Sequence, residues 1–198
     1  MKKNSYDTII IGCGTAGIYA GYELDKLMPG MSILMLEQGR DIYHRFCPIV
    51  ENKVPSCISC NTCGIMNGFG GAGAFSDGKY NFTTQFGGWL NEYLDDEKIM
   101  ELIEYVDSVN VSFGATLKRF STNSPEAREI SKKALSYDLH LLEAEVKHLG
   151  TENNRKILSK IYDYLNERVE ISCESAVESI DRNEGGYTIT LANGKQAS

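Results

Sequence analysis

Three glycines stand at G-x-G-x-x-G spacing in the segment Gly12-Cys13-Gly14-Thr15-Ala16-Gly17. A β-branched run at residues 8–11 precedes the segment, and helical spacing of apolar residues follows it from 15 to about 28. Pro29-Gly30 ends this helix, and a second apolar run occupies residues 32–36. The pattern predicts a strand, a tight turn, a helix and a parallel strand covered on both faces.

Each glycine of the turn has a mechanical reason. Gly12 permits the sharp turn, Gly14 lets backbone amides approach a pyrophosphate, and Gly17 lets the helix pack closely on the strand. Glu37 follows at the end of the second strand, where its carboxylate can accept hydrogen bonds from ribose hydroxyls and repel a 2′-phosphate. The unit predicts a dinucleotide site that disfavours NADP, with FAD and NAD both open. A glycine-rich turn without a ligand is the alternative.

The rest of the chain carries weaker local patterns. Residues 38–88 show no sustained period, and such a long connection is usually functional or disordered. Helices are predicted at 91–109, 124–136 and 152–168, and strands at 139–149 and 169–172. Residues 176–182 and 187–191 predict a β-hairpin across 183–186.

Charge and composition limit the partners. The net charge of −7 comes with dispersed lysines and arginines, which gives no footprint for nucleic acid or an anionic membrane. Met1-Lys2-Lys3 is basic, but the apolar run after it is too short for a signal sequence or a membrane span. We expect a cytoplasmic protein with a small-molecule partner.

Four of the six cysteines fall within residues 47–63. Cys57, Cys60 and Cys63 have C-x2-C-x2-C spacing, with Cys47 as a possible fourth ligand. Thiolates that converge in this way hold iron–sulfur clusters or tetrahedral zinc, so a cluster, a zinc ion, a thiol redox role and reduced structural cysteines all stay open. Cys13 and Cys173 are predicted to be packing residues.

A second glycine-rich segment runs from residue 68 to residue 79. Its Gly70-Gly71-Ala72-Gly73 core has almost no side chains, so its backbone can approach a ligand closely. Ser76 and Lys79 can donate to phosphate or flavin oxygens. A flexible surface loop would explain the same glycines.

These motifs carry a family resemblance. YDTIIIGCGTAGIYAGYEL and LEQGR resemble the FAD-binding N-terminus of glutathione-reductase-type flavoproteins. The CPI triplet at 47–49, the later cysteines, GFGGAGAFSDGKYN at 68–81 and HLGTENNRKIL at 148–158 resemble a family of bacterial and archaeal FAD-dependent dehydrogenases. The resemblance covers most of the 198 residues, and GGAGAFSDGK is its most specific part.

The resemblance implies an α/β fold with a Rossmann-like parallel FAD-binding sheet, a β-hairpin and a helical insertion. Gly12, Gly14, Gly17 and Glu37 would hold the ADP half of FAD, residues 70–79 would lie along the pyrophosphate and flavin, and Val177 would offer its backbone to the adenine. The full expected cofactor set is Gly12, Gly14, Thr15, Ala16, Gly17, Glu37, Gln38, Arg40, Gly70, Gly71, Ala72, Gly73, Ser76, Asp77, Lys79 and Val177.

The same family implies a longer chain. Its members continue after the hairpin into a strand that pairs beside the first one, so we expect an incomplete FAD-binding domain with an open edge at residues 8–11. Within a single domain of 1–198, residues 1–40 and 138–198 would form the Rossmann-like portion, and 41–137 the glycine- and cysteine-rich loop and helical insertion.

The expected function is flavin-dependent oxidoreduction, in which FAD takes electrons from a small-molecule substrate and passes them to a second acceptor. No catalytic acid or base is assigned. The alternatives are a truncated, non-enzymatic nucleotide-binding module and an iron–sulfur or thiol redox protein centred on Cys47, Cys57, Cys60 and Cys63.

Overall fold

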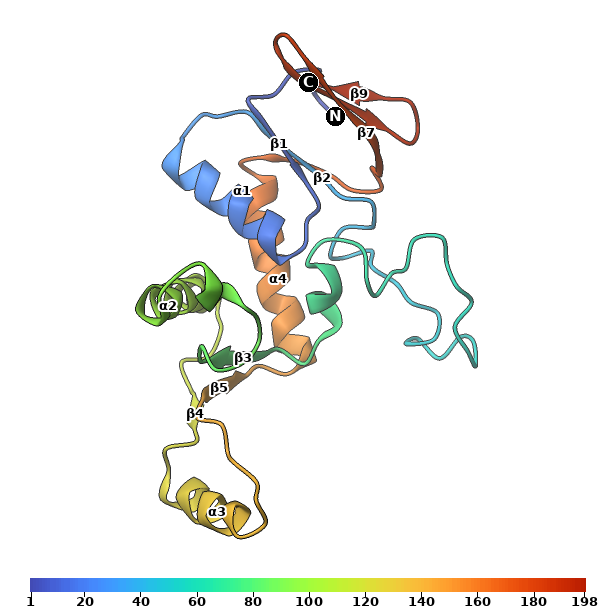
Figure 1. The fold of residues 1–198 in the computed structure, drawn as a ribbon. Coiled ribbons are helices and arrows are strands. Elements are labelled where there is room, and N and C mark those ends of the chain that lie inside the picture. Colours follow the sequence, from blue (N-terminus) through green and yellow to red (C-terminus); the bar gives the residue numbers. More distant parts are fainter. The chain divides into compact units, whose positions relative to one another are not determined.

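The computed structural model describes residues 1–198, which divide into two compact units (Figure 1). The first unit contains residues 1–75 and 158–198, and the second contains residues 76–157. The sequence predicts a single domain with boundaries at 40 and 138. The boundaries of the compact units differ because the strand at 145–148 pairs with the strand at 79–82, which holds both in the second unit.

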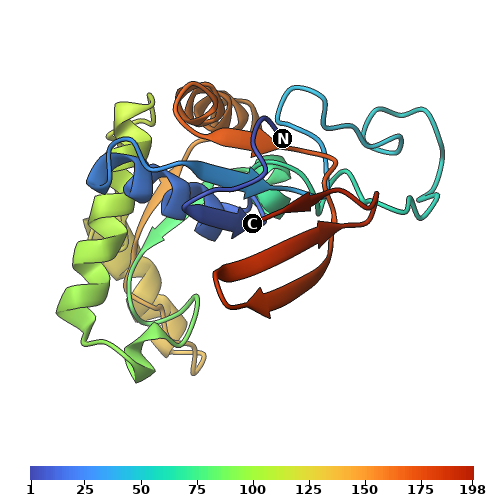
Figure 2. The same cartoon turned by 90° about the horizontal axis from the view of Figure 1, so that it is seen from above.

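A three-stranded parallel sheet lies at the centre of the first unit (Figure 2). Its strands are β1 (Thr8–Ile11), β2 (Ile33–Leu36) and β6 (Glu170–Ser172), in the order β1-β2-β6. Helix α1 (Thr15–Leu27) connects β1 to β2. All four side chains of β2 are buried, as expected for the central strand of a covered parallel sheet. The predicted strand–helix–strand unit is confirmed.

Strand β1 occupies one edge of this sheet, because its only ladder partner is β2. Thr8 aligns with Ile33, and Ile11, at the other end of the strand, aligns with Leu36 and is half exposed. This arrangement agrees with the expected open edge at residues 8–11.

An antiparallel sheet completes the first unit. It consists of β7 (Val177–Asn183), β8 (Gly186–Leu191) and the short β9 (Gln196–Ala197). The predicted hairpin is confirmed as β7 and β8. Strand β9, which has only two residues, was not predicted. Inward-facing side chains of this sheet pack on the parallel sheet in one apolar cluster, whose buried members are Leu34, Leu36, Ile189, Leu191 and Ala197.

The glycine turn shows why these residues must be small. Gly12 has φ of +95°, which disfavours a side chain. A Cβ on Gly17 would collide with the carbonyl oxygen of Gly12, and one on Gly21 would come within 2.8 Å of the Met35 sulfur. Only glycine fits at position 17, where the clash is with backbone, whereas at position 21 the flexible end of Met35 could move aside.

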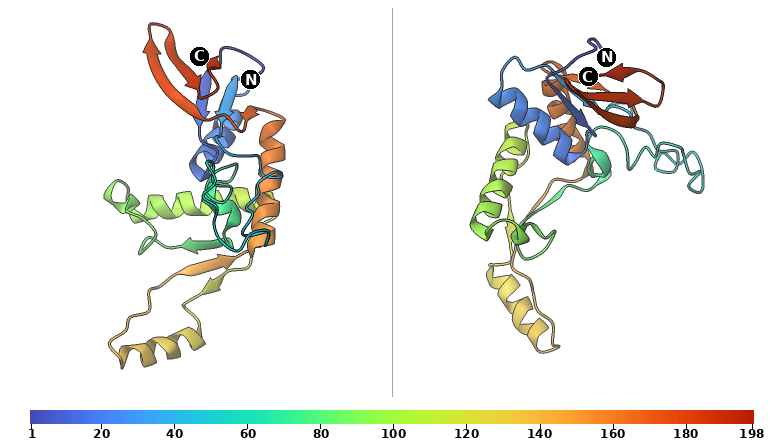
Figure 3. Two further views of the ribbon diagram at one scale, coloured as in Figure 1. Left: turned by 90° about the vertical axis from the view of Figure 1, so that its right-hand side faces the viewer. Right: turned by 45° about the horizontal axis from the view of Figure 1, so that its top comes forward.

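The second unit contains an antiparallel sheet and two longer helices (Figure 3). The strands are β3 (Lys79–Phe82), β4 (Phe120–Ser121) and β5 (Glu145–His148), in the order β3-β5-β4. The helices are α2 (Asp96–Ser112) and α3 (Pro125–Leu135), with a 3-10 turn, η2, at Leu90–Glu92. Helix α4 (Thr151–Asn166) spans the boundary between the two units in sequence.

Two predictions in this region need correction. Helix α2 begins at Asp96 rather than at 91, because the Asp95 side chain caps it by accepting a hydrogen bond from the Lys98 N–H at 2.7 Å. The insertion at 41–137 is also not only loop and helix, since β3 and β4 lie within it. Both are short and form by pairing with β5, so their own residues carry little period.

The remaining elements agree with prediction more closely. Helix α3 is confirmed, and Ser124 caps it by accepting a hydrogen bond from the Ala127 N–H at 3.1 Å. The predicted strand at 139–149 shortens to β5, and the helix at 152–168 becomes α4. None of the helices combines the length and the apolar character that a membrane span requires.

A buried ion cluster organises the second unit. Lys147 of β5 is fully buried and places its Nζ 2.6 Å and 2.7 Å from the two carboxylate oxygens of Asp107 on α2. Arg119 donates to Asp107 at 2.9 Å and to both oxygens of Glu104 at 2.6 Å, and its guanidinium lies 3.6 Å from the centre of the Phe82 ring. The Lys147–Asp107 pair is buried, whereas Arg119 and Glu104 are partly exposed. Together these contacts tie α2 to the sheet.

We expect Gly17→Ala to destabilise the protein by about 1–3 kcal/mol, because the new methyl group has to push helix α1 away from the Gly12 carbonyl in the turn. Chemical denaturation measures the change. The control is Gly185→Ala in the hairpin turn, where the nearest atom to a new Cβ is 3.7 Å away. Equal stability of the two variants would contradict the close approach of α1.

We expect Lys147→Met to cost about 3 kcal/mol, because it leaves a buried carboxylate with one of its two cationic partners removed. Denaturation followed by circular dichroism measures it. Lys98→Met removes an exposed pair with Glu101 and should change stability by less than about 0.5 kcal/mol. A small effect of both substitutions would show that the Lys147 pair contributes little.

Candidate functional site

A cavity of about 380 Å³ lies at the carboxyl ends of β1 and β2 in the first unit. Ile11 and Leu36, the last residues of these strands, line it, and the glycine turn lies at its edge. Six residues of the expected cofactor set line this one cavity: Gly12, Gly14, Glu37, Gln38, Gly71 and Val177. Gly68, from the second glycine-rich segment, lines it as well, and so do Met66, Asn67 and Ser175, which were not predicted.

The amino end of helix α1 opens at this cavity. Gly14 is the N-cap and makes no side-chain cap, and a Cβ built on Gly14 would meet nothing within 4 Å. The first N–H groups of a helix have no partner within the helix, and the helix dipole adds positive potential there. This end of α1 can therefore receive a phosphate group from the cavity.

Glu37 is the most constrained side chain of the cavity. It is only 5% exposed, and its carboxylate accepts hydrogen bonds from three backbone N–H groups. Oε2 accepts from Cys13 at 2.8 Å, and Oε1 accepts from Gly39 and Gly68, each at 2.8 Å. One carboxylate thus joins the glycine turn, the end of β2 and the second glycine-rich segment.

These bonds modify the role expected for Glu37. A carboxylate offers about four acceptor positions, and backbone donors occupy three of them here. The sequence suggests a carboxylate that binds both ribose hydroxyls. In the structure, most of the acceptor positions of Glu37 are used to hold the glycine turn, the end of β2 and the second glycine-rich segment together.

The second glycine-rich segment packs against the first. The Gly70 N–H donates to the Cys13 carbonyl at 2.8 Å, and a Cβ on Gly71 would lie 3.2 Å from the Gly14 Cα. Gly68, Gly70 and Gly71 all have positive φ, which explains why glycine occurs three times here. A 3-10 turn, η1 (Gly71–Phe75), follows.

The remaining members of the expected cofactor set lie elsewhere. Thr15, Ala16, Gly17, Arg40, Gly70, Ala72 and Gly73 belong to the first unit without lining this cavity. Ser76, Asp77 and Lys79 belong to the second unit, where Lys79 pairs with Asp77 at 3.0 Å.

Arg45 is an organising residue that sequence reasoning missed. It is 5% exposed, and its guanidinium donates to the carbonyls of Gly64, Ile65, Phe69 and Gly71. It also lies 4.9 Å from the centre of the Phe75 ring. An arginine in a segment without regular period gives no sequence signal of burial, so only the folded loop reveals it.

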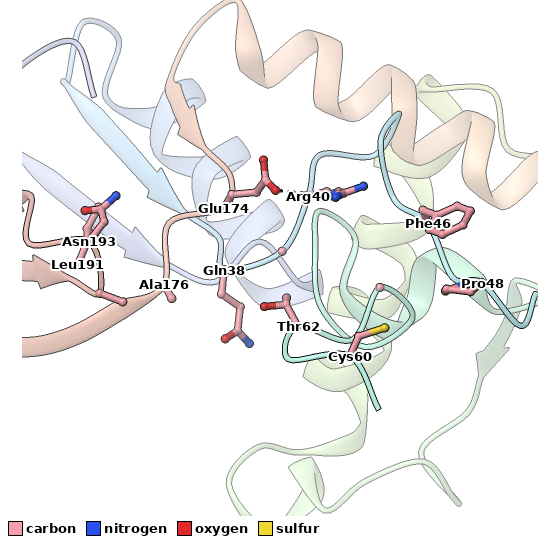
Figure 4. A pocket seen from close by; sticks show the side chains of 13 residues that line it. Gln38, Arg40, Phe46, Pro48, Cys60, Thr62, Glu174, Ala176, Leu191 and Asn193 are labelled. Carbon is pink, nitrogen blue, oxygen red and sulfur yellow. Dashed lines mark ion pairs between the residues drawn. The ribbon is translucent and has the colours of Figure 1, made fainter. Parts of the chain in front are cut away.

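A larger cavity of about 600 Å³ lies beside the first one (Figure 4). Gln38 lines both cavities, and its side-chain amide donates to the Asn67 side chain at 2.5 Å. Arg40 and Glu174 form an ion pair at 3.5 Å on the wall of the larger cavity. Thr62, Cys60 and Asn193 add polar groups elsewhere on the lining of the same cavity.

All six cysteines are free thiols. The structure contains no group of three or more His, Cys, Asp or Glu side chains arranged to hold a metal ion, so its geometry does not support Cys47, Cys57, Cys60 and Cys63 as a ligand set. Burial raises the pKa of Cys173 to about 12 and raises that of Cys13 further, which suits the packing role expected for both.

Comparison with known proteins gives a fold but no family. No protein-family model matches the chain, and no curated protein matches it in sequence. The solved structure of 3-ketosteroid-Δ4-(5α)-dehydrogenase from Rhodococcus jostii RHA1, in complex with 4-androstene-3,17-dione, is 16% identical with a TM-score of 0.55. The match covers 98% of this chain and 44% of that one.

Two further solved structures match at lower TM-scores. PqsL from Pseudomonas aeruginosa, a probable FAD-dependent monooxygenase, is 14% identical with a TM-score of 0.44. This match covers 98% of the present chain and 40% of the PqsL chain. The L-amino acid deaminase from Proteus vulgaris is 12% identical with a TM-score of 0.48. This match covers 99% of the present chain and 46% of the deaminase chain. The chain thus spans less than half the length of each of these proteins, and the first match shows a shared fold.

We expect Glu37→Gln to destabilise the first unit by about 1–3 kcal/mol, because the new amide NH2 has to face a backbone N–H that now donates to a carboxylate oxygen. Denaturation measures the stability, and hydrogen exchange at Cys13 and Gly68 measures the local opening. Glu174→Gln is the control, since that carboxylate is exposed and paired only at the surface. Unchanged exchange at both amides would contradict the structural role of Glu37.

Proposed function

We propose that this chain binds FAD and forms the cofactor-binding part of a flavin-dependent oxidoreductase. The observation that carries the proposal is the cavity at the carboxyl ends of β1 and β2, where the glycine turn, Glu37 and the second glycine-rich segment meet. In open parallel sheets, nucleotides bind at this position. We interpret the parallel sheet as the core of a Rossmann-like fold.

The residues present fit the phosphate-bearing part of a dinucleotide. The space above Gly14, the amino end of α1 and the backbone of Gly71 would hold the pyrophosphate. Thr15, Ala16 and Gly17 belong to the first turn of the same helix. The acceptor position that Glu37 retains would receive one ribose hydroxyl.

The adenine would lie toward β7. Val177 and Gln38 line the cavity at that end, and Arg40 stands two residues beyond Gln38. Gly70, Ala72 and Gly73, which lie in the first unit, would offer backbone to the rest of the cofactor.

Bound FAD would supply the redox chemistry by accepting an electron pair from a small-molecule substrate and passing it to a second partner. The chain's own residues bind and orient the cofactor. Glu37 keeps the two glycine-rich segments together, and the buried Arg45 fixes the loop that forms one wall of the cavity. The shared fold with a dehydrogenase supports this class of function.

We expect the purified protein to bind FAD and ADP, and Gly14→Val to weaken both at least about tenfold, because the side chain fills the space over the helix end. Quenching of flavin fluorescence measures FAD, and calorimetry measures ADP. FMN, which lacks the adenosine half, should bind much more weakly than FAD.

The matched control is Gly185→Val, which places the same side chain in the hairpin turn and should leave binding unchanged. Circular dichroism establishes that both variants are folded. Equal affinity of wild type and Gly14→Val for FAD would overturn the proposed location. Binding of ADP and NAD without binding of FAD would overturn the proposed cofactor.

A further inference from the structure

Helix α3 and the segment after it form an excursion between β4 and β5 in the second unit (Figure 3). Two hydrogen bonds close its base. The Thr122 N–H donates to the Ala144 carbonyl at 3.1 Å, and the Thr122 hydroxyl accepts from the Ala144 N–H at 3.0 Å. No residue of α3 is buried, so the second unit leaves this helix open to a partner.

The apolar residues of α3 follow a heptad pattern. Ala127 and Ala134 occupy one apolar position of the heptad, and Ile130 occupies the other, three residues after Ala127. Ile130 is 62% exposed, and the two alanines are half-buried. Tyr137 continues the pattern just after the helix and is exposed as well. Small alanines beside an exposed isoleucine let a second helix approach closely.

Two opposite charges flank this apolar stripe on the same side. Glu126 and Lys133 are one heptad apart, and each directly precedes one of the alanines, at the position that flanks the core of a coiled coil. Neither forms an ion pair within the chain. The Glu126 carboxylate accepts hydrogen bonds from its own backbone N–H and from Ser124, which lower its pKa and leave further acceptor positions. Both charges can therefore meet a partner.

The signs and the spacing of these charges fit a second copy of the same helix that runs in the opposite direction. A twofold axis near Ile130 would place Glu126 of each copy beside Lys133 of the partner subunit, so that two ion pairs form. In a parallel pair, the same heptad position faces Ser131 and Asp138. Ser131 is uncharged and Asp138 lies beyond the end of the helix, so only the antiparallel pair satisfies both charges.

We infer that one face of α3 is the contact surface of an antiparallel homodimer of this chain. The face consists of Glu126, Ala127, Ile130, Lys133 and Ala134. Because a pair of 11-residue helices buries little area, we expect a weak dimer with a Kd on the order of 100 µM. The inference does not depend on FAD binding.

Sedimentation equilibrium of the 198-residue chain, at protein concentrations from about 10 µM to about 1 mM, measures the association. We expect wild type to dimerise and Lys133→Glu to weaken the dimer at least about tenfold, because Glu126 then faces a second carboxylate. Lys132→Glu is the matched control. It makes the same change on the side of the helix away from the stripe and should leave the Kd within about twofold of wild type. All six cysteines are free thiols, so a reducing agent is present to exclude disulfide-linked dimers.

A mixture of two variants separates loss of the contact from loss of folding. Glu126→Lys alone also brings like charges together and should weaken the dimer as Lys133→Glu does. An equimolar mixture of the two should associate as wild type does, because both ion pairs form again in the heterodimer. Circular dichroism establishes that the variants are folded. If Glu126→Lys unfolds the first turn of α3, Glu126→Gln takes its place and should restore part of the association.

Three results would overturn the inference. The first is a chain that stays monomeric at about 1 mM. The second is an equal effect of Lys133→Glu and Lys132→Glu, and the third is a mixture of folded variants that associates no better than either variant alone. Flotation of a monomeric chain with phosphatidylglycerol vesicles would assign the face to a lipid surface instead. The measurements contain no FAD, so failure of the flavin proposal leaves their outcome unaffected.

Discussion

The buried carboxylate of Glu37 is the contact on which the rest of the first unit depends. It accepts hydrogen bonds from Cys13, Gly39 and Gly68, three backbone donors from segments far apart in the sequence. Buried donors without an acceptor are costly, so the carboxylate removes three such costs at once. The glycine turn, the end of β2 and the second glycine-rich segment thereby share one position, and the cavity that they line is a consequence.

Arg45, which carries the opposite charge, plays a role similar to that of Glu37. Glu37 collects backbone N–H groups, whereas Arg45 donates to backbone carbonyls of residues 64–71. Between them, an irregular loop without helix or strand acquires a defined path. In the second unit, Lys147, Asp107 and Arg119 have a similar task, since their charges join α2 to a sheet of very short strands. Ionic groups thus hold an irregular loop in the first unit and join a helix to a sheet in the second.

Prediction from sequence succeeded where a local pattern carries the information. The β-branched run of β1, the helical spacing of α1 and the glycines between them specify a strand, a turn and a helix from neighbouring residues alone. Gly12, Gly14, Glu37 and Gln38 line one cavity because they follow the ends of the adjacent parallel strands β1 and β2. Gly71 and Val177 join them from other segments. Prediction failed for β3 and β4, whose few residues form strands only because β5 supplies the hydrogen-bonding partner.

The sequence by itself determined the strand–turn–helix–strand unit. Glycine suits position 12 because φ is +95° there, and it suits position 17 because a side chain would collide with the turn. It also determined which cysteines share a loop. Only the tertiary structure decided that Glu37 faces three backbone amides and that Arg45 is buried among backbone carbonyls of residues 64–71. The physical reason is that a charge is buried only where the fold brings partners to it from distant segments, and no local pattern encodes that meeting.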